Sequence, residues 1–129
     1  MPHANEGILR AIDEAQAKGD VEGFFGMFAD DVKLHIQGNH KLTGDYAGKA
    51  QLQEVYGRFM EAAGENSFEN HGYLADDVHG VTFQTAHYNR GGKTLDLDET
   101  FVVHFRAGKV AELWYLPLNA AALDAFIGR

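Results

Sequence analysis

The second half of the chain contains four strand-like segments in succession, and this pattern constrains the fold more than any other feature of the sequence. The segments span residues 67–74, 80–89, 93–105 and 109–116. Asp-Asp, Gly-Gly and Ala-Gly pairs separate them, and such pairs are typical of turns between neighbouring strands. We therefore expect three consecutive antiparallel hairpins.

The first half of the chain supplies helices and one further strand. Apolar residues recur at three- and four-residue steps over 6–18, which predicts an amphipathic helix that ends at Gly19. Asp20 can cap a second, short and very apolar helix, and a third helix is expected to end at Gly64. Between these two helices, apolar and polar residues alternate over 32–36, which predicts a half-buried strand.

Two shorter segments complete the pattern. Residues 44–48, Gly-Asp-Tyr-Ala-Gly, are expected to form a loop, and residues 119–127 are expected to form a last helix across one mouth of the sheet. Helices followed by a run of strands indicate an α+β fold with the helices on one face of an antiparallel sheet. At 129 residues, we expect one domain, 1–129, whose core needs neither disulfides nor metals.

Composition excludes several classes of partner. The net charge of −8 repels phosphate backbones, so no nucleic acid partner is expected. No apolar run approaches the roughly 20 residues that a membrane span needs, and the first residues lack the order of a signal peptide. The chain has no cysteine, which fits a reducing compartment. We expect a soluble, cytoplasmic protein without a membrane partner.

Four short strings occur in an order and spacing that resemble a known family. They are Gly-Asp at 19–20, Phe-Ala-Asp-Asp-Val at 28–32, Leu-Thr-Gly-Asp-Tyr-Ala-Gly at 42–48 and Gly-Lys-Val-Ala-Glu-Leu-Trp at 108–114. Together they resemble the SnoaL-like branch of the nuclear transport factor 2-like, ketosteroid isomerase-like superfamily, and the resemblance covers nearly the whole chain. It implies a cone-shaped, curved antiparallel β-sheet with three to four helices that enclose a hydrophobic pocket.

The resemblance leaves the activity open, because this superfamily includes isomerases, hydrolases, dehydratases, polyketide cyclase-like enzymes and proteins that only bind or scaffold. It implies a small apolar or aromatic metabolite as the partner, and a homodimer formed through the outer sheet face. Placed against ketosteroid isomerase, the catalytic tyrosine and the two carboxylate positions fall on Ile12, Ile36 and Phe101. The catalytic aspartate of SnoaL-type cyclases also falls on Phe101. Any catalysis must therefore use a different set of residues.

Glu99 is the first candidate for that set. In the segment 93–105, every second residue from position 95 on is apolar except Glu99, so one face of this strand is expected to be apolar around a single carboxyl group. Desolvation raises the pKa of such a carboxyl group, and proteins obtain general acids and bases near neutrality in this way. The alternative is that Glu99 pairs with a cation such as Arg58 or Arg90, or reaches solvent at the rim of the sheet.

His87 is the second candidate, and its orientation depends on the next turn. A two-residue Gly91-Gly92 loop would pair His87 with Asp96 on the polar side of the sheet. A three-residue loop that includes Arg90 would instead join the two apolar stripes and place His87 on the wall that carries Glu99. We favour the three-residue loop, which leaves the two side chains too far apart for a hydrogen bond.

His35 and Tyr46 are possible polarising groups. Alternation places His35 on the polar side of its strand, whereas SnoaL-like sequences often carry a histidine at this position near the pocket. A twist at the end of the strand would turn His35 toward the pocket mouth, where Tyr46 could approach it. The alternative, with equal support, is that His35 lies at the surface or in a dimer interface.

The pocket itself is expected to be lined by apolar and aromatic side chains. Trp114 and Tyr115 are adjacent on one strand and must face opposite sides, and we place Trp114 inside. The expected lining residues are Ile12, Phe24, Phe28, Leu34, Ile36, Tyr56, Phe59, Phe83, Leu97, Phe101 and Trp114.

The histidine spacings match no metal-binding signature, and the sequence has no nucleotide-binding glycine motif. We expect neither a metal nor a cofactor. The favoured function is an enzyme that transfers protons on an apolar, carbonyl-bearing metabolite, as an isomerase, dehydratase or cyclase does. The alternative is a non-catalytic protein that binds a hydrophobic ligand or serves as a dimeric scaffold.

Overall fold

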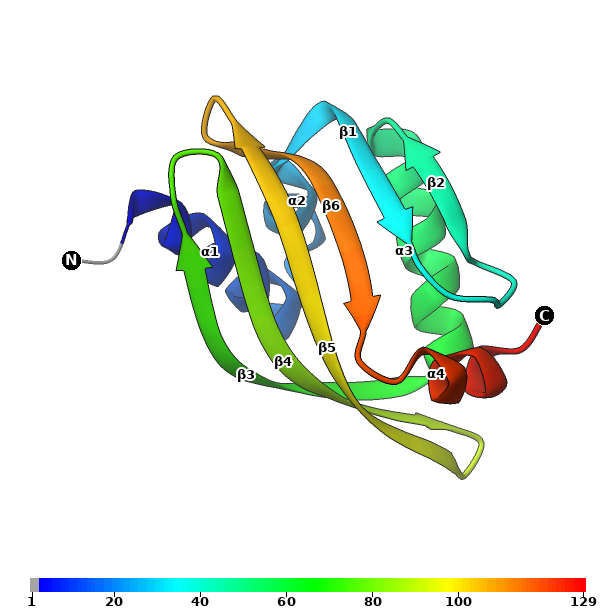
Figure 1. Ribbon diagram of the computed structural model, residues 1–129. Coiled ribbons are helices and arrows are strands. Elements are labelled where there is room, and N and C mark those ends of the chain that lie inside the picture. The colour runs from blue at the N-terminus through cyan, green and yellow to red at the C-terminus, as the bar shows by residue number, and fades with distance from the viewer. Residues whose placement is uncertain (1–2) are drawn as a thin grey trace.

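The computed structural model describes residues 3–129, which form four helices and a six-stranded sheet (Figure 1). The elements in chain order are α1 (Ala4–Lys18), α2 (Val21–Gly26), β1 (Phe28–Ile36), β2 (Gly44–Ala47), α3 (Lys49–Ala63), β3 (Glu65–Ala75), β4 (His79–Arg90), β5 (Lys93–Arg106), β6 (Lys109–Pro117) and α4 (Ala120–Ile127). No helix within residues 3–129 is long and apolar enough to cross a membrane.

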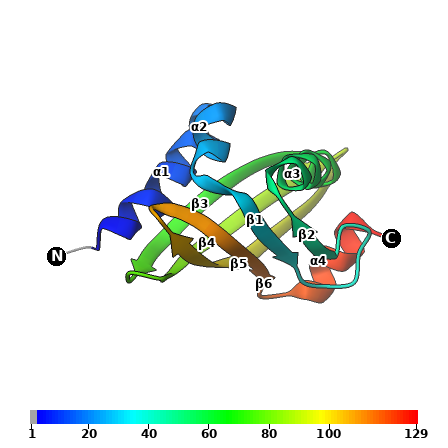
Figure 2. The same ribbon diagram turned by 90° about the horizontal axis from the view of Figure 1, so that it is seen from above.

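The sheet has the strand order β2-β1-β6-β5-β4-β3. Strands β3 to β6 form the predicted antiparallel meander. β1 pairs in parallel with β6, so the sheet is antiparallel except at this one position. Helices α1, α2 and α3 lie on one side of the curved sheet (Figure 2), which confirms the α+β cone.

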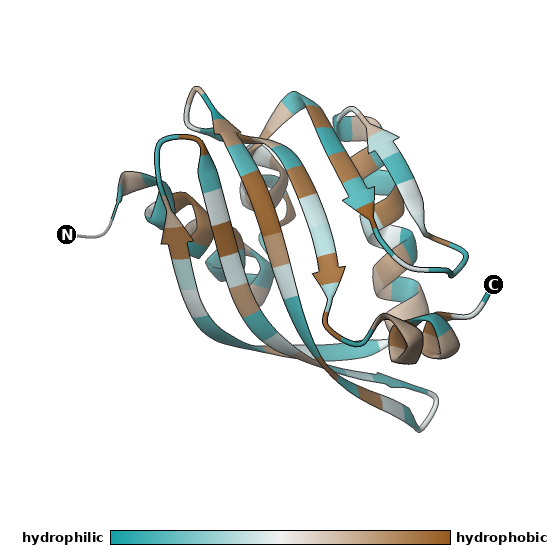
Figure 3. Cartoon of the chain, in the orientation of Figure 1, coloured by the Kyte–Doolittle hydropathy of each residue, from teal (hydrophilic) through white to brown (hydrophobic). Residues whose placement is uncertain are grey.

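Alternation along the strands places the core between the sheet and the helices (Figure 3). The inward-facing residues of β5 include Leu97, Val103 and Phe105, which are all buried. Helix α4 adds Leu123 and Phe126 to the same core. The result is one apolar layer whose curvature leaves room for a cavity.

The helix ends follow the sequence signals closely. The side chain of Asp20 accepts a hydrogen bond from the Gly23 amide and caps α2, as predicted. Gly19 ends α1 in the left-handed conformation, with φ of 70°. The short loop between these helices fixes α1 and α2 side by side.

Two local predictions were wrong. Residues 44–47 form strand β2 rather than a loop, because they pair with β1 and extend the sheet at its edge. The turn between β4 and β5 has two residues rather than three, since Arg90 pairs directly with Lys93. Gly91 and Gly92 have φ of 60° and 88°, and two consecutive positive φ values define a tight two-residue hairpin turn.

Candidate functional site

A cavity of about 120 Å³ lies between the inner face of the sheet and helices α1, α2 and α3. Its wall is mostly apolar and aromatic. The predicted lining residues found in it are Ile12, Phe24, Phe28, Leu34, Ile36, Tyr56, Phe59 and Phe101. Helix α1 brings Ile12 to the cavity, whereas Phe101 comes from β5, so the space is enclosed by elements from both halves of the chain.

Glu99 lies in the wall of this cavity and is only 1% exposed. Its neighbours come from the strands on either side of β5. Gln84 on β4 donates a hydrogen bond of 2.7 Å from Nε2 to Oε1, and the hydroxyl of Tyr88 lies 3.3 and 3.2 Å from the two carboxylate oxygens. The hydroxyl of Tyr115 on β6 donates to Oε2. We call Glu99, Gln84, Tyr88 and Tyr115 the Glu99 cluster.

The Glu99 cluster contains no cation. Within residues 3–129, Glu99 forms no salt bridge, because Arg58 is exposed and the Arg90 guanidinium donates to the carbonyl oxygens of Ala62 and Phe126. Burial raises the pKa of Glu99, and the hydrogen bonds from Tyr115, Gln84 and Tyr88 only partly offset this effect. Burial also raises the pKa of both tyrosines. Glu99 therefore keeps its proton up to a higher pH than an exposed glutamate does.

A second carboxyl group reaches the cavity from the opposite wall. Asp13 on α1 accepts hydrogen bonds at Oδ2 from the Tyr73 hydroxyl, at 2.7 Å, and from Asn70 Nδ2, at 2.9 Å. Burial raises the pKa of Asp13 against the lowering effect of these two donors. Gln16, one turn along α1, donates from Nε2 to the Tyr56 hydroxyl at 3.0 Å, and both side chains also line the cavity.

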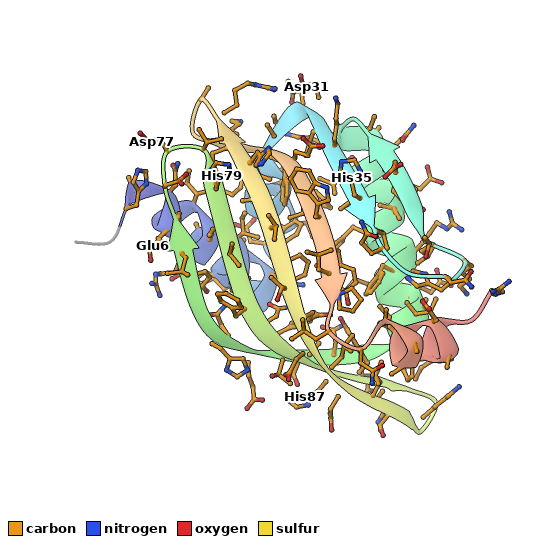
Figure 4. The ribbon with its side chains drawn as sticks, viewed as in Figure 1. Glu6, Asp31, His35, Asp77, His79 and His87 are labelled. Carbon is orange, nitrogen blue, oxygen red and sulfur yellow. The ribbon has the colours of Figure 1, made fainter. Side chains whose placement is uncertain are left out.

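The prediction that His87 shares the apolar wall with Glu99 is wrong. The two-residue turn pairs His87 with Asp96, so the imidazole lies on the outer face of the sheet (Figure 4). There Nδ1 is 2.6 Å from Asp96 and Nε2 is 2.9 Å from Glu69. Both carboxylates raise the pKa of His87. Its place on the inner face is taken by Tyr88.

His35 also lies on the outer face, as alternation indicated (Figure 4). Its Nδ1 and Nε2 are each 2.6 Å from a carboxylate oxygen, of Asp45 and Glu112 respectively. Tyr46 does not approach His35, because its hydroxyl donates to the Leu42 carbonyl oxygen at 2.8 Å. Neither side chain lines the cavity.

Three of the expected lining residues lie elsewhere. Trp114 is on the outer face, where it stacks on His35 at a ring-centroid distance of 5.2 Å, and Tyr115 takes the inner position. Phe83 is on the outer face and 40% exposed, since β4 has the opposite register to the one predicted. Leu97 is buried in the core but does not reach the cavity.

The sequence prediction missed several polar residues of the cavity, although the sequence contains signals for them. The spacing of Leu9, Asp13 and Gln16 places them on one stripe of α1, which would have indicated Asp13. The correct hairpin register places Gln84 directly opposite Glu99 and turns Tyr88 inward. Residues 3–129 hold no group of three or more metal-ligating side chains placed to bind an ion.

A curved sheet with helices over a largely apolar cavity defines the nuclear transport factor 2-like class of pocket folds. The family model described as the SnoaL-like domain matches residues 8–113. The chain belongs to the SnoaL-like domain family, whose members typically bind small molecules.

A relative and two solved structures are similar to the chain over at least 95% of its length. The chain is 26% identical over 125 residues to an uncharacterized protein of Mycobacterium tuberculosis, covering 95% of each chain. Bal32a, from a soil-derived mobile gene cassette, is 25% identical with a TM-score of 0.89 over 96% of each chain. A nuclear transport factor 2-like protein of unknown function from Burkholderia pseudomallei shares the fold, with 18% identity, a TM-score of 0.85 and coverage of 97% and 98%.

Proposed function

We propose that this protein is a cofactor-independent enzyme that transfers protons on a small, neutral, carbonyl-bearing ligand held in the cavity. The observation that carries the proposal is the Glu99 cluster, a buried carboxyl group surrounded by neutral donors and free of any cationic partner among the described residues. A purely structural carboxyl group at such a position would be costly unless paired.

The chemistry follows from the raised pKa of Glu99 and from the hydroxyl groups beside it. Because burial raises its pKa, Glu99 holds a proton more readily than an exposed glutamate does. When Glu99 carries a proton it can donate to the Tyr88 or Tyr115 hydroxyl oxygen, and that tyrosine is then free to donate to a ligand carbonyl oxygen and stabilise the charge that an enolate develops there. Isomerisation, dehydration and aldol-type cyclisation all proceed through such an enol or enolate.

The charge and the volume of the cavity restrict the class of ligand that it can bind. The described lining residues include the carboxyl groups of Glu99 and Asp13 but no Lys, Arg or His, so an anionic ligand would be repelled. A dry apolar cavity of roughly 150 Å³ holds a benzene molecule, and the cavity of this protein is of similar size. A neutral ketone of about one ring is the fitting class of probe.

The test is deuterium incorporation into cyclohexanone and 2-cyclohexen-1-one in D2O, followed by NMR. We expect the wild-type protein to accelerate exchange of the hydrogens next to the carbonyl group. Glu99→Gln should reduce the acceleration at least ~100-fold, the usual scale of a general acid or base. Glu61→Gln, the same change at an exposed position of α3, is the matched control and should behave as wild type. Exchange at the buffer rate with the wild-type protein would refute catalysis on this class.

A non-catalytic binding protein is the second candidate function. It is favoured by the saturation of Glu99, whose two oxygens both accept hydrogen bonds from protein side chains. Such a cluster could serve only to orient a bound metabolite. Incubation of the purified protein with a cell extract separates the two functions, because an enzyme yields products over time and a binding protein retains one unchanged compound.

A further inference from the structure

The two carboxyl groups that line the cavity differ in how many of their oxygen atoms accept hydrogen bonds from the protein. Both oxygens of Glu99 accept hydrogen bonds, from Gln84, Tyr88 and Tyr115. In Asp13, both hydrogen bonds fall on Oδ2. Within residues 3–129, no donor is within hydrogen-bond distance of Asp13 Oδ1 and no cation pairs with this carboxylate. Among the described residues that line the cavity, Asp13 is thus the carboxyl group that has one oxygen atom, Oδ1, available to a ligand.

The surroundings of Asp13 hold it in one orientation. The two donors, Tyr73 and Asn70, come from the same strand, β3, and approach one oxygen at 2.7 and 2.9 Å. The ring of Tyr73 is in turn covered by the Arg10 guanidinium, 4.8 Å from its centroid. Two hydrogen bonds on Oδ2 fix the plane of the carboxylate, which leaves the direction of Oδ1 defined before any ligand enters.

We propose that Asp13 is the general base of the cavity and acts through Oδ1, opposite the Glu99 cluster. This inference rests on the function proposed above. Asp13 lines the cavity from α1, whereas Glu99 lines it from β5 in the sheet. A ligand between them has a proton acceptor on one side and a group that stabilises its carbonyl oxygen on the other.

The proton-transfer step is balanced without any further reactant. The C–H bond next to the ligand carbonyl breaks, its proton forms an O–H bond with Asp13 Oδ1, and the electron pair moves to the carbonyl oxygen. There the hydrogen bonds of the Glu99 cluster stabilise the enolate. Return of the proton to a different carbon completes an isomerisation. Alternatively, the proton leaves with a β-hydroxyl group as water, which completes a dehydration.

The first test is Asp13→Asn in the cyclohexanone exchange assay, because asparagine keeps the shape and the Oδ acceptor but cannot take a proton. We expect exchange to fall at least ~100-fold, while the Kd of cyclohexanone stays within about threefold. Glu14→Gln, an exposed carboxylate on the same helix, is the matched control and should leave exchange unchanged. Exchange by Asp13→Asn at the wild-type rate would overturn the inference but leave the function proposed for Glu99 standing. A wild-type protein without exchange would refute both.

The second test uses the pH profile, which a merely structural role of Asp13 would not move. The Tyr73 hydroxyl lowers the pKa of Asp13, so Tyr73→Phe should raise this pKa. A base is active only when it is deprotonated. The exchange rate of this variant should therefore begin to fall at a higher pH than the rate of the wild type does. The plateau rate at high pH should remain near that of the wild type. A fall at the same pH as in the wild type, in a folded Tyr73→Phe protein, contradicts the assignment.

Discussion

His35 occupies an unusual position for a histidine on the outer face of a sheet. Carboxylates of Asp45 and Glu112 contact its two ring nitrogens, and the ring stacks on Trp114. The hydrogen bond to Asp45 is the main cause of a raised pKa, and the bond to Glu112 adds to it. Since the folded state favours the charged form, the stabilisation is fully present below the unfolded pKa of about 6.5 and is lost as pH rises through the folded pKa.

Trp114, the only tryptophan of the chain, reports this titration. A protonated imidazole quenches a stacked indole, so we expect fluorescence to rise with pH, with a midpoint above 6.5. Asp45→Asn removes the main cause of the raised pKa of His35 and should lower the midpoint, whereas Glu112 also lies 3.9 Å from His104 Nδ1 and would not separate the two histidines. His104 also contacts Trp114, with ring centroids 4.8 Å apart. His104→Gln is therefore the control, and a pH transition that is lost in that variant but unmoved in Asp45→Asn would assign the signal to His104.

Residue-level prediction succeeded where a position depends on alternation alone. Glu99 could be placed on the inner face because β5 alternates without interruption around it. Trp114 could not, because alternation separates it from Tyr115 without stating which of the two faces inward. That choice depends on the register with β5, which shifts between His104 and Phe105. A shift of this kind leaves no pattern in the sequence.

At the scale of elements, the junction between α3 and β3 depends on one glycine. Gly64 has φ of 78°, and a Cβ atom there would lie 2.3 Å from the Asn89 carbonyl oxygen. This close approach lets β3 begin beside the end of β4 directly after the helix. A side chain at this position would both strain the backbone and separate the two strands.

Two glycines of the same region provide a matched comparison. We expect Gly64→Ala to lower the free energy of unfolding by about 1–3 kcal/mol, because of the strained φ and the clash. Gly57 lies inside α3 with no atom within 4 Å of a Cβ, so Gly57→Ala should raise it by up to about 1 kcal/mol through helix propensity. Urea unfolding of both variants checks the pair. Equal changes in the two would show that contact at residue 64 is unimportant.

The helices and the meander could be predicted from the sequence because their signals are local: periodicity, caps and glycine turns. The hairpin between β4 and β5 shows where local signals conflict. A three-residue loop was favoured because it would place the apolar residues Val81 and Phe83 on the same face as the apolar residues of β5. The pair Gly91-Gly92 favoured a two-residue turn. The turn geometry prevailed, and β4 turned a face with Thr82, Gln84 and Tyr88 toward the cavity. A polar inner face cannot be recognised by a search for apolar stripes.

For the whole molecule, the outer face of the sheet carries a row of apolar side chains. Leu74, Val81, Val102 and Trp114 are direct neighbours across β3, β4, β5 and β6. Leu74 is 62% exposed. A continuous apolar row on an exposed face is typical of a protein–protein contact, so the homodimer expected from the family resemblance remains a prediction for this face.

Light scattering coupled to size-exclusion chromatography tests the dimer. We expect a mass of two chains for the wild-type protein and of one chain for Val102→Asp, because a charge in the centre of the row would be desolvated without a partner. Val21→Asp is the control, since Val21 is 64% exposed on α2, away from the sheet. A monomeric wild-type protein, or a dimeric Val102→Asp variant, contradicts the prediction.

The parallel pairing of β1 with β6 brings Lys33 beside Glu112 and joins two strands that lie far apart in the sequence. During synthesis, β1 therefore emerges from the ribosome long before the strand on which it must dock. Contacts of such high sequence separation form late and slowly. Until β6 is complete, the meander from β3 to β5 ends in an unpaired edge that can associate with other chains. Because Leu113 and Tyr115 of β6 line the cavity, a nascent chain has a complete ligand site only after β6 has joined the sheet.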